Sequence, residues 1–138
     1  MNKSIFLRSV IAGIFSLVTI GFLTLLTYKT DLGVFLIASF GSTMVLLYGY
    51  PESPFAQPKN IFFGHLITSL VGIFILYFVK LPIYVTLPIA VGLGVFLMIL
   101  FNVTHPPAGG WVIFNIIIKA TPAPTAIGKL IYKGKGIK

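Results

Sequence analysis

The sequence has no cysteine and only two acidic residues, Asp31 and Glu52, among its 138 residues. Without cysteine the chain can form no disulfide, no thiolate metal site and no cysteine nucleophile. The two acids stand in separate short polar segments, so we expect no carboxylate pair for acid–base catalysis and no carboxylate site for a metal cation. Two histidines, His65 and His105, make a poor zinc site without thiolates or nearby acids. We find no nucleophile–histidine–acid pattern or nucleotide-binding signature, and therefore expect neither an enzyme nor a cofactor.

Charged residues of either sign are scarce. They make up 9% of the chain, against 57% hydrophobic residues, and the mean hydropathy is +1.05. A soluble domain carries roughly 25% charged residues, so this composition predicts an integral membrane protein with the lipid bilayer as its partner. The formal net charge is +8. Because the basic residues stand at the ends of apolar runs, we expect them to meet anionic headgroups rather than nucleic acid.

Long apolar runs predict an all-α bundle of about four transmembrane helices. The runs are residues 5–27, 32–50, 61–79 and a fourth that begins at residue 83 or 88 and ends near 101. About 20 residues at 1.5 Å each cross roughly 30 Å of hydrocarbon. The first run is longer than a signal-peptide core and no small-residue cleavage site follows it, so we expect it to be retained. The second run either crosses as one helix or breaks into two pieces at Gly41. We assign residues 1–120 to the transmembrane domain and 121–138 to a short basic tail.

Small side chains recur at helical spacing in the third and fourth runs. They stand at Gly64, Thr68 and Gly72, and at Ala90, Gly94 and Met98. Such stripes let neighbouring helices approach closely, because lipid offers no hydrophobic drive for helix association and close packing must supply it. We therefore expect tight packing within the bundle and a homo-oligomer of this small chain.

Residues 102–110, Asn-Val-Thr-His-Pro-Pro-Ala-Gly-Gly, interrupt the apolar sequence. The two prolines end the incoming helix and the glycines permit a sharp turn, which we expect to precede a half-helix over residues 111–118. Eight residues reach roughly 12 Å, too short to cross. A glycine-rich turn before a helix exposes amide N–H groups at the positive end of the helix dipole, which suits an anion. The alternative is a polar hinge between two helices.

Residues 51–60 contain three prolines, which predicts an extended, semi-rigid loop. This loop carries Gln57, Lys59 and Asn60, and it either holds a substrate, covers a pore mouth or only connects two helices. His65 follows near the start of the third run, beside its small-residue stripe. An ionisable group inside a membrane segment is a functional-site hypothesis, although this one stands close enough to the helix start to reach the interface instead.

The distribution of basic residues predicts the topology. With four crossings, Lys3, Arg8, Lys59 and the C-terminal lysines share one side, while Lys29 and Lys80 lie on the other. The positive-inside rule then places both termini in the cytoplasm, in a plasma or inner membrane. On this topology, the proline-rich loop and the His-Pro-Pro segment lie on the same side and can meet.

Two separate motifs resemble one known family. The first is Ser-Phe-Gly-Ser-Thr-Met-Val-Leu-Leu-Tyr-Gly at residues 39–49, followed by Ser-Pro-Phe-Ala-Gln-Pro-Lys-Asn at 53–60 and by Gly64 and His65. The second is His-Pro-Pro-Ala-Gly-Gly at residues 105–110. In this order they resemble the HPP family of integral membrane proteins over about residues 5–118. The resemblance implies four spans, and some members from photosynthetic lineages are associated with nitrite transport. Family members usually continue with another hydrophobic stretch, where this chain turns basic.

These features give a leading functional hypothesis, a small transporter or channel for an inorganic anion such as nitrite. The candidate site residues are Gly41, Ser42, Gln57, Lys59, Asn60, His65, Asn102, Thr104, His105, Gly109 and Gly110. Lys59 and His105 would supply charge, Asn60 and Asn102 would supply hydrogen bonds, and amides near Gly109 would contact an oxyanion. The alternative is a non-transporting membrane subunit that packs against a partner protein or anionic lipid.

Overall fold

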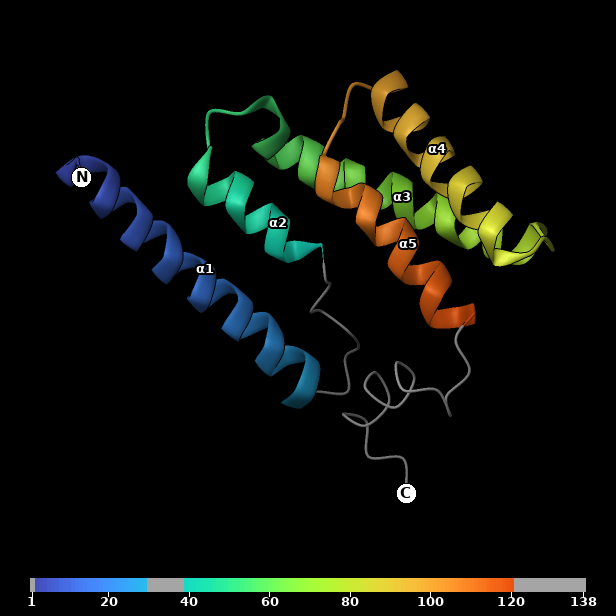
Figure 1. Cartoon of the computed structure of the whole chain (residues 1–138), viewed down its shortest axis with the longest axis horizontal. Helices are drawn as coiled ribbons and strands as arrows, with labels where there is room; N and C mark the ends of the chain where they lie inside the picture. Colours follow the sequence, from blue (N-terminus) through green and yellow to red (C-terminus); the bar gives the residue numbers. More distant parts are fainter. Residues whose placement is uncertain (1, 30–38, 121–138) are drawn as a thin grey trace.

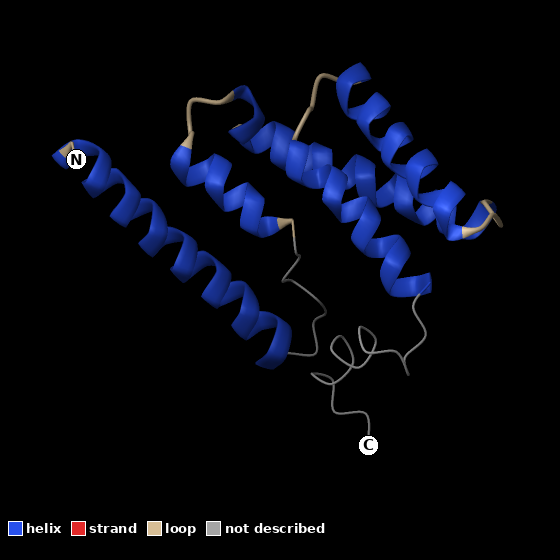
Figure 2. Ribbon diagram, viewed as in Figure 1, coloured by secondary structure: helices blue, strands red, loops and turns tan. Residues whose placement is uncertain are grey.

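A computed structural model describes residues 2–29 and 39–120, and every regular element in these ranges is helical (Figures 1 and 2). The elements in order are α1 (Lys3–Lys29), α2 (Phe40–Met44), the π-helical turn η1 (Val45–Gly49), the 3-10 turn η2 (Pro54–Ala56), α3 (Pro58–Phe78), α4 (Ile83–Leu100) and α5 (Pro106–Ala120). The prediction of an all-α membrane protein is confirmed.

Three helices, α1, α3 and α4, are long and apolar enough to cross a membrane. They correspond to the first, third and fourth apolar runs. The second run is described only from residue 39, and its visible part, Phe40–Gly49, is a shorter apolar helix. Whether the second run crosses the membrane therefore stays a prediction. Asp31 and the basic tail, residues 121–138, also lie outside the described residues.

The core lies where α3, α4 and α5 pack together (Figure 1). The stripe on α3 is buried at Gly64, Thr68 and Gly72, and the stripe on α4 is buried at Ala90, Gly94 and Met98. The buried residues of the central cluster are Val71, Ile75, Ala90, Val112 and Ile116. The predicted small-residue faces thus form the helix–helix contacts, and they hold α5 against both of its neighbours.

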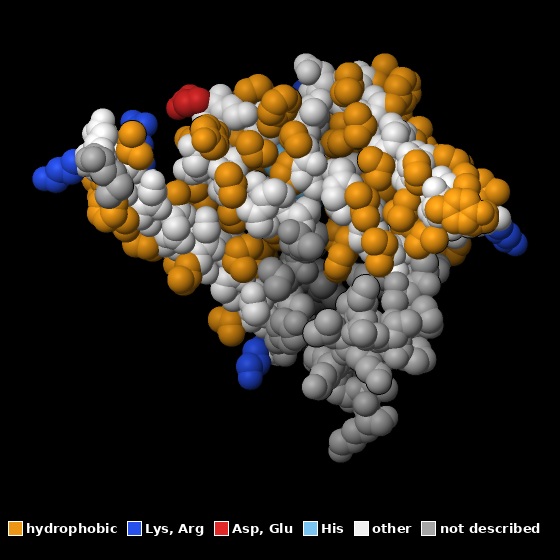
Figure 3. Space-filling model, in the orientation of Figure 1, with side chains coloured by type: hydrophobic (Ala, Val, Ile, Leu, Met, Phe, Trp, Pro, Cys, Tyr) orange, Lys and Arg blue, Asp and Glu red, His pale blue; other side chains and the backbone are white. Residues whose placement is uncertain are grey.

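Helix α1 stands apart from this core. None of its membrane-length window is buried, and it packs beside the α2–η1 segment (Figure 1). Tyr48 supplies the specific contacts, a 2.8 Å hydrogen bond between its hydroxyl and that of Thr19 and a ring contact with Phe15 at 5.7 Å between centroids. Figure 3 shows hydrophobic side chains spread over this face, with basic side chains near the ends of helices. Such a surface suits contact with lipid.

Two helix starts differ from the sequence-based prediction. The expected half-helix over residues 111–118 begins at Pro106 instead, and α5 reaches 15 residues, roughly 22 Å. Likewise Pro58 opens α3, so Lys59 and Asn60 lie in its first turn rather than in an extended loop. Both corrections have one cause: proline fits the first turn of a helix, where its missing N–H would have no partner. Helix α5 remains shorter than the roughly 30 Å of hydrocarbon.

Of the two alternatives for the second run, a break at Gly41 is not seen in the described residues. Ser39 already has helical backbone angles, φ −68° and ψ −15°, and its carbonyl accepts the N–H of Thr43. Gly41 therefore lies inside the first turn of α2. The helix then widens into the π-helical turn η1. Such turns are rare in proteins, and those that occur are often found at functional sites.

Candidate functional site

His105 lies at the centre of the polar region and has no exposed surface. It stands between α4 and α5, and its Nδ1 lies 2.7 Å from the carbonyl oxygen of Phe55 in η2. A carbonyl oxygen can only accept, so Nδ1 carries the proton and donates it. The proline-rich loop and the His-Pro-Pro segment therefore meet, as the topology predicted. Burial lowers the pKa of His105 from its ordinary value, and the hydrogen bond to the Phe55 carbonyl opposes this shift.

The second ring nitrogen of His105 connects it to α2. Its Nε2 lies 3.0 Å from the Thr43 hydroxyl, which is also 3.2 Å from the carbonyl oxygen of Ser39. In the neutral ring Nε2 accepts, so the Thr43 hydroxyl donates to it. A hydroxyl has one proton and can donate to one of these two acceptors at a time. One buried imidazole thus links the η2 turn to α2.

His65 lies beside His105, but its ring makes no hydrogen bond in the described part of the chain. Both of its ring nitrogens are buried without a partner. Its ring stacks on Phe40 of α2 at 5.5 Å between centroids and lies 5.2 Å from the ring of His105. Buried polar atoms are nearly always satisfied in folded proteins, and an exception calls for an unseen ligand, an ion or a function.

A second unpartnered group lies in the same region. The hydroxyl oxygen of Ser39 is buried with no hydrogen bond among the described residues. Ser39 lies across from α5, because a Cβ placed on Gly110 would be 3.9 Å from that of Ser39. We call Ser39, Thr43, His65 and His105 the polar cluster. It joins α2, α3 and the start of α5, and three of its buried polar atoms have no partner among the described residues.

Hydrogen bonds connect α5 to the part of α3 that carries His65. The indole N–H of Trp111 donates to the Ser69 hydroxyl at 2.6 Å, and that hydroxyl donates to the carbonyl of His65 at 2.7 Å. These bonds fix α5 against the turn of α3 that carries the histidine. These bonds therefore fix the backbone position of His65, while its ring nitrogens have no hydrogen-bond partner among the described residues.

Comparison with known proteins identifies the family. The chain matches the family described as "HPP, transmembrane region" over residues 1–132. It belongs to the HPP transmembrane family.

Two curated relatives, both described as transmembrane proteins of Dictyostelium discoideum, match part of this HPP chain. One is 39% identical over 77 residues, which are 54% of this chain and 27% of the relative. The other is 36% identical over 93 residues, which are 63% of this chain and 30% of the relative. The chain thus spans less than a third of either relative. No solved structure matches.

The two histidines of the HPP motifs come together, but most other predicted site residues do not join them. The Gln57 amide donates to the carbonyls of Pro51 and Ser53 at 3.3 Å each, and the Asn60 amide donates to that of Pro54 at 2.7 Å. Both side chains therefore hold the proline-rich loop in shape and stabilise the η2 turn that supplies the Phe55 carbonyl. Their amide groups thus bond within the loop whose η2 turn contacts His105.

Asn102 closes α4. Its φ is +53°, the left-handed conformation that asparagine tolerates better than most residues. Its N–H donates to Ile99 and the N–H of Val103 donates to Met98, which together form a Schellman helix cap. The exposed Asn102 side chain thus belongs to a helix terminus. This cap redirects the chain so that His105 turns back against α3.

The expected oxyanion contact at Gly109 and Gly110 is not available as predicted. Both glycines lie inside α5, which begins at Pro106. The two prolines have no N–H, and the N–H of Ala108 already donates to the carbonyl of His105 at 2.9 Å. The start of α5 therefore offers few free amides. The prolines that mark the motif remove the donors that a glycine-rich turn would have exposed.

The remaining candidates lie around the cluster. Lys59 is exposed on the first turn of α3, Gly41 and Ser42 are exposed on α2, and Thr104 is half-buried beside His105. The Ser42 hydroxyl donates to the carbonyl of Ser39 at 2.8 Å. Ser39, Thr43 and the Phe55 carbonyl are not among the site residues predicted from the sequence. The signal for the first two was their place in an apolar run that also carries a family motif.

Close backbone packing at Gly64 gives a testable prediction. A Cβ on Gly64 would lie 2.9 Å from the Cβ of His105 and 3.3 Å from the carbonyl oxygen of Val103, neither of which can move freely. We expect Gly64→Ala to lower the free energy of unfolding by about 1–3 kcal/mol through overpacking. Gly92→Ala on α4 meets no atom within 4 Å and is expected to be neutral or stabilising. Thermal unfolding of both variants in the same detergent measures this, and equal losses would contradict the close contact.

Proposed function

We propose that this HPP protein moves a small inorganic anion, with nitrite as the first candidate, through the polar cluster. The observation that supports this most directly is His65, an imidazole in a membrane-length helix whose two ring nitrogens are buried and have no partner in residues 2–29 and 39–120. Such groups in membrane segments mark substrate and ion pathways. Its place on α3 is seven residues from the helix start, roughly 10 Å along the axis, so a ligand would reach it after entering the bundle.

The chemistry of the cluster favours an anion. A neutral imidazole has one N–H donor, and the Ser39 hydroxyl is a second donor without a partner among the described residues. Glu52 carries the one carboxylate that the described residues contain, and it is exposed outside the cluster. A cation would therefore meet no negative charge there. Nitrite could accept a hydrogen bond on each oxygen, and such bonds are stronger in a low-dielectric interior than in water.

The structure has a closed cluster, and η2 covers it. Nδ1 of His105 donates its hydrogen bond to the Phe55 carbonyl in η2, and the Asn60 amide stabilises the η2 turn by donating to the Pro54 carbonyl. Entry from this end would need η2 to move away from His105. The proposed cycle is therefore an opening of the proline-rich loop, binding of the anion at His65 and Ser39, and reclosure. The free histidine provides the binding site and the bonded histidine holds the cover.

Nitrite uptake into proteoliposomes tests the proposal. Purified full-length protein is reconstituted in liposomes and compared with empty liposomes at neutral pH or above, because nitrous acid crosses bilayers unaided. We expect saturable uptake that other small monovalent anions inhibit and that exchanging one external cation for another does not change. Uptake equal to that of empty liposomes, with correctly folded protein, would contradict transport and favour the non-transporting subunit. Cross-linking in mild detergent would then show whether the proposed homo-oligomer forms.

A further inference from the structure

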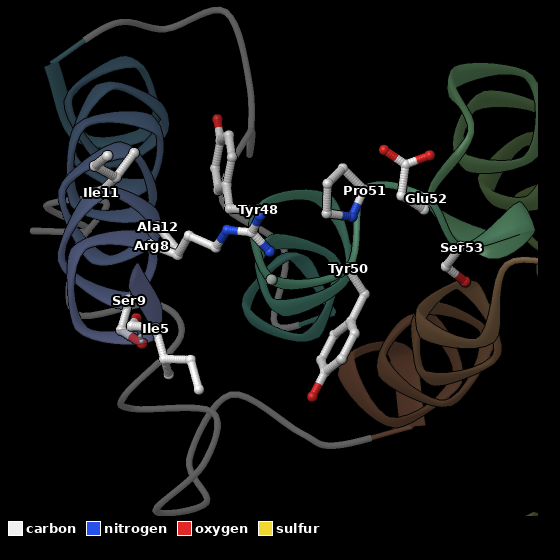
Figure 4. Close-up of a pocket in the computed structure, with 11 residues that line it drawn as sticks. Ile5, Arg8, Ser9, Ile11, Ala12, Tyr48, Tyr50, Pro51, Glu52 and Ser53 are labelled. Atoms are coloured by element: carbon white, nitrogen blue, oxygen red, sulfur yellow. Dashed lines mark hydrogen bonds between the residues drawn. The ribbon is translucent and has the colours of Figure 1, made fainter. Parts of the chain in front are cut away.

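A separate cleft lies between α1 and the end of the α2–η1 segment, away from the polar cluster. Its volume is about 950 Å³, within the range of ligand pockets. The lining residues on α1 are Ile5, Arg8, Ser9, Ile11 and Ala12, and those opposite are Tyr48, Gly49, Tyr50, Pro51, Glu52 and Ser53. Figure 4 shows Arg8 reaching from α1 across the cleft toward η1. Tyr48 contacts Thr19 and Phe15 of α1, and the cleft lies closer to the start of that helix.

The side chain of Arg8 has no ion pair or hydrogen bond in the described part of the chain. Glu52 lines the same cleft, but the two side chains make no salt bridge with each other. An arginine has five N–H donors in a planar fork that matches the oxygens of a phosphate. Ser53 and Tyr50 also line the cleft with hydroxyl groups, whereas the Ser9 hydroxyl there already donates to the carbonyl of Ile5 at 2.9 Å. The polar part of this cleft therefore offers donors to a single negative group.

The depth of Arg8 matches the headgroup layer. Helix α1 has 27 residues and is roughly 40 Å long, which is close to the full thickness of a bilayer with its headgroups. Arg8 lies five residues from the start of α1, roughly 8 Å along the axis. The exposed apolar side chains of Ile5 and Ile11, 60% and 45% exposed, line the cleft beside it. A ligand with a phosphate and an apolar body fits both kinds of wall.

We propose that this cleft binds an anionic phospholipid, with the phosphate of its headgroup against Arg8 and its acyl chains along α1. Basic pockets between transmembrane helices bind anionic headgroups in this way. A free phosphate ion would use Arg8 but leave the apolar walls uncovered, so the lipid is the better match. The lipid would fill the space between α1 and η1 and hold the first helix on the bundle. This inference does not depend on anion transport.

Lipid binding by native mass spectrometry tests it with three variants. The full-length protein in detergent is titrated with phosphatidylglycerol and, separately, with phosphatidylcholine. We expect tighter binding of phosphatidylglycerol, and we expect Arg8→Gln to weaken it roughly fivefold, the effect of one basic residue near an anionic surface. Lys3→Gln is the matched control, because Lys3 has the same charge on the same helix but does not line the cleft. It should change binding less than twofold.

Glu52→Gln and free phosphate separate the alternatives. Removing the negative charge of Glu52 should tighten lipid binding, since a phosphate beside it is repelled. Weaker lipid binding in Glu52→Gln would instead mean that Glu52 supports Arg8 directly, and would overturn the proposal. Equal effects of Arg8→Gln and Lys3→Gln, or equal binding of the two lipids, would overturn it too. Displacement of the lipid by millimolar inorganic phosphate would show a site for a soluble anion.

Discussion

His105→Ala is expected to lose about 3–5 kcal/mol of folding free energy, the largest stability effect of any single change we propose. The ring has no exposed surface, and its removal leaves a cavity between α3, α2 and η2. It also leaves the Phe55 carbonyl without the donor that His105 supplies, while the Thr43 hydroxyl can still donate to the Ser39 carbonyl. An unsatisfied buried group costs more than the net value of the hydrogen bond that satisfied it. Unfolding in detergent, followed by circular dichroism, measures the loss.

His65→Ala is the matched control for this prediction. It removes the same side chain from the same cluster, 5.2 Å away, but breaks no hydrogen bond among the described residues. We expect its loss of stability to be clearly smaller than that of His105→Ala. His105→Asn should recover part of the loss, because its amide can still donate toward the Phe55 carbonyl. Equal losses at the two histidines would contradict the assignment of His105 as the structural one.

The arrangement of helices could be predicted largely from hydropathy and spacing. The apolar runs gave the three long helices, and the stripes at Gly64–Thr68–Gly72 and Ala90–Gly94–Met98 gave the faces that pack. The apolar runs and the small-residue stripes each involve many residues, so neither prediction depends on a single position. The meeting of the proline-rich loop with the His-Pro-Pro segment also followed, because an even number of crossings puts both at one end of the bundle.

Helix starts were harder to predict, because proline can either begin or end a helix and glycine can lie either in a turn or in a helix. At Pro106 and Pro58 the proline begins a helix, although the same residue inside a helix would end it. Gly109 and Gly110 were predicted to form a turn, yet both lie in α5. Local sequence cannot distinguish the cases, since the choice depends on whether the following residues pack as a helix. Here Val112 and Ile116 are buried in the core, and that packing favours the helix.

The site was predicted only in part, for a related reason. Gln57 and Asn60 have amides that look free in the sequence, but they bond to carbonyls four to six residues away. Ser39 and Thr43 belong to the cluster because α2 packs against α5, which no spacing within one run reveals. A sequence shows which polar groups are present. Which of them are left without partners is decided by tertiary packing.

The second large effect concerns transport, where His65→Phe is expected to reduce nitrite uptake at least tenfold while the protein stays folded. Phenylalanine keeps an aromatic ring against Phe40 but removes both ring nitrogens, which have no partner to lose in the described chain. The variant should therefore match the wild type in stability or exceed it, because it replaces a buried unsatisfied group by an apolar one. Reduced uptake with unchanged stability separates a binding role from a structural one.

Leu66→Phe is the matched control for this change, since it adds a ring to the next residue of α3, whose side chain is exposed. We expect its uptake to stay within twofold of the wild type. His65→Gln keeps a hydrogen-bond donor and should retain more uptake than His65→Phe, and Ser39→Ala should lower uptake by less than His65→Phe does. Full uptake in His65→Phe would move any pathway away from the polar cluster. His105 is hydrogen-bonded within the cluster, whereas the ring of His65 has no partner among the described residues. We therefore expect His105→Ala to act mainly on stability, and His65→Phe to act mainly on nitrite uptake.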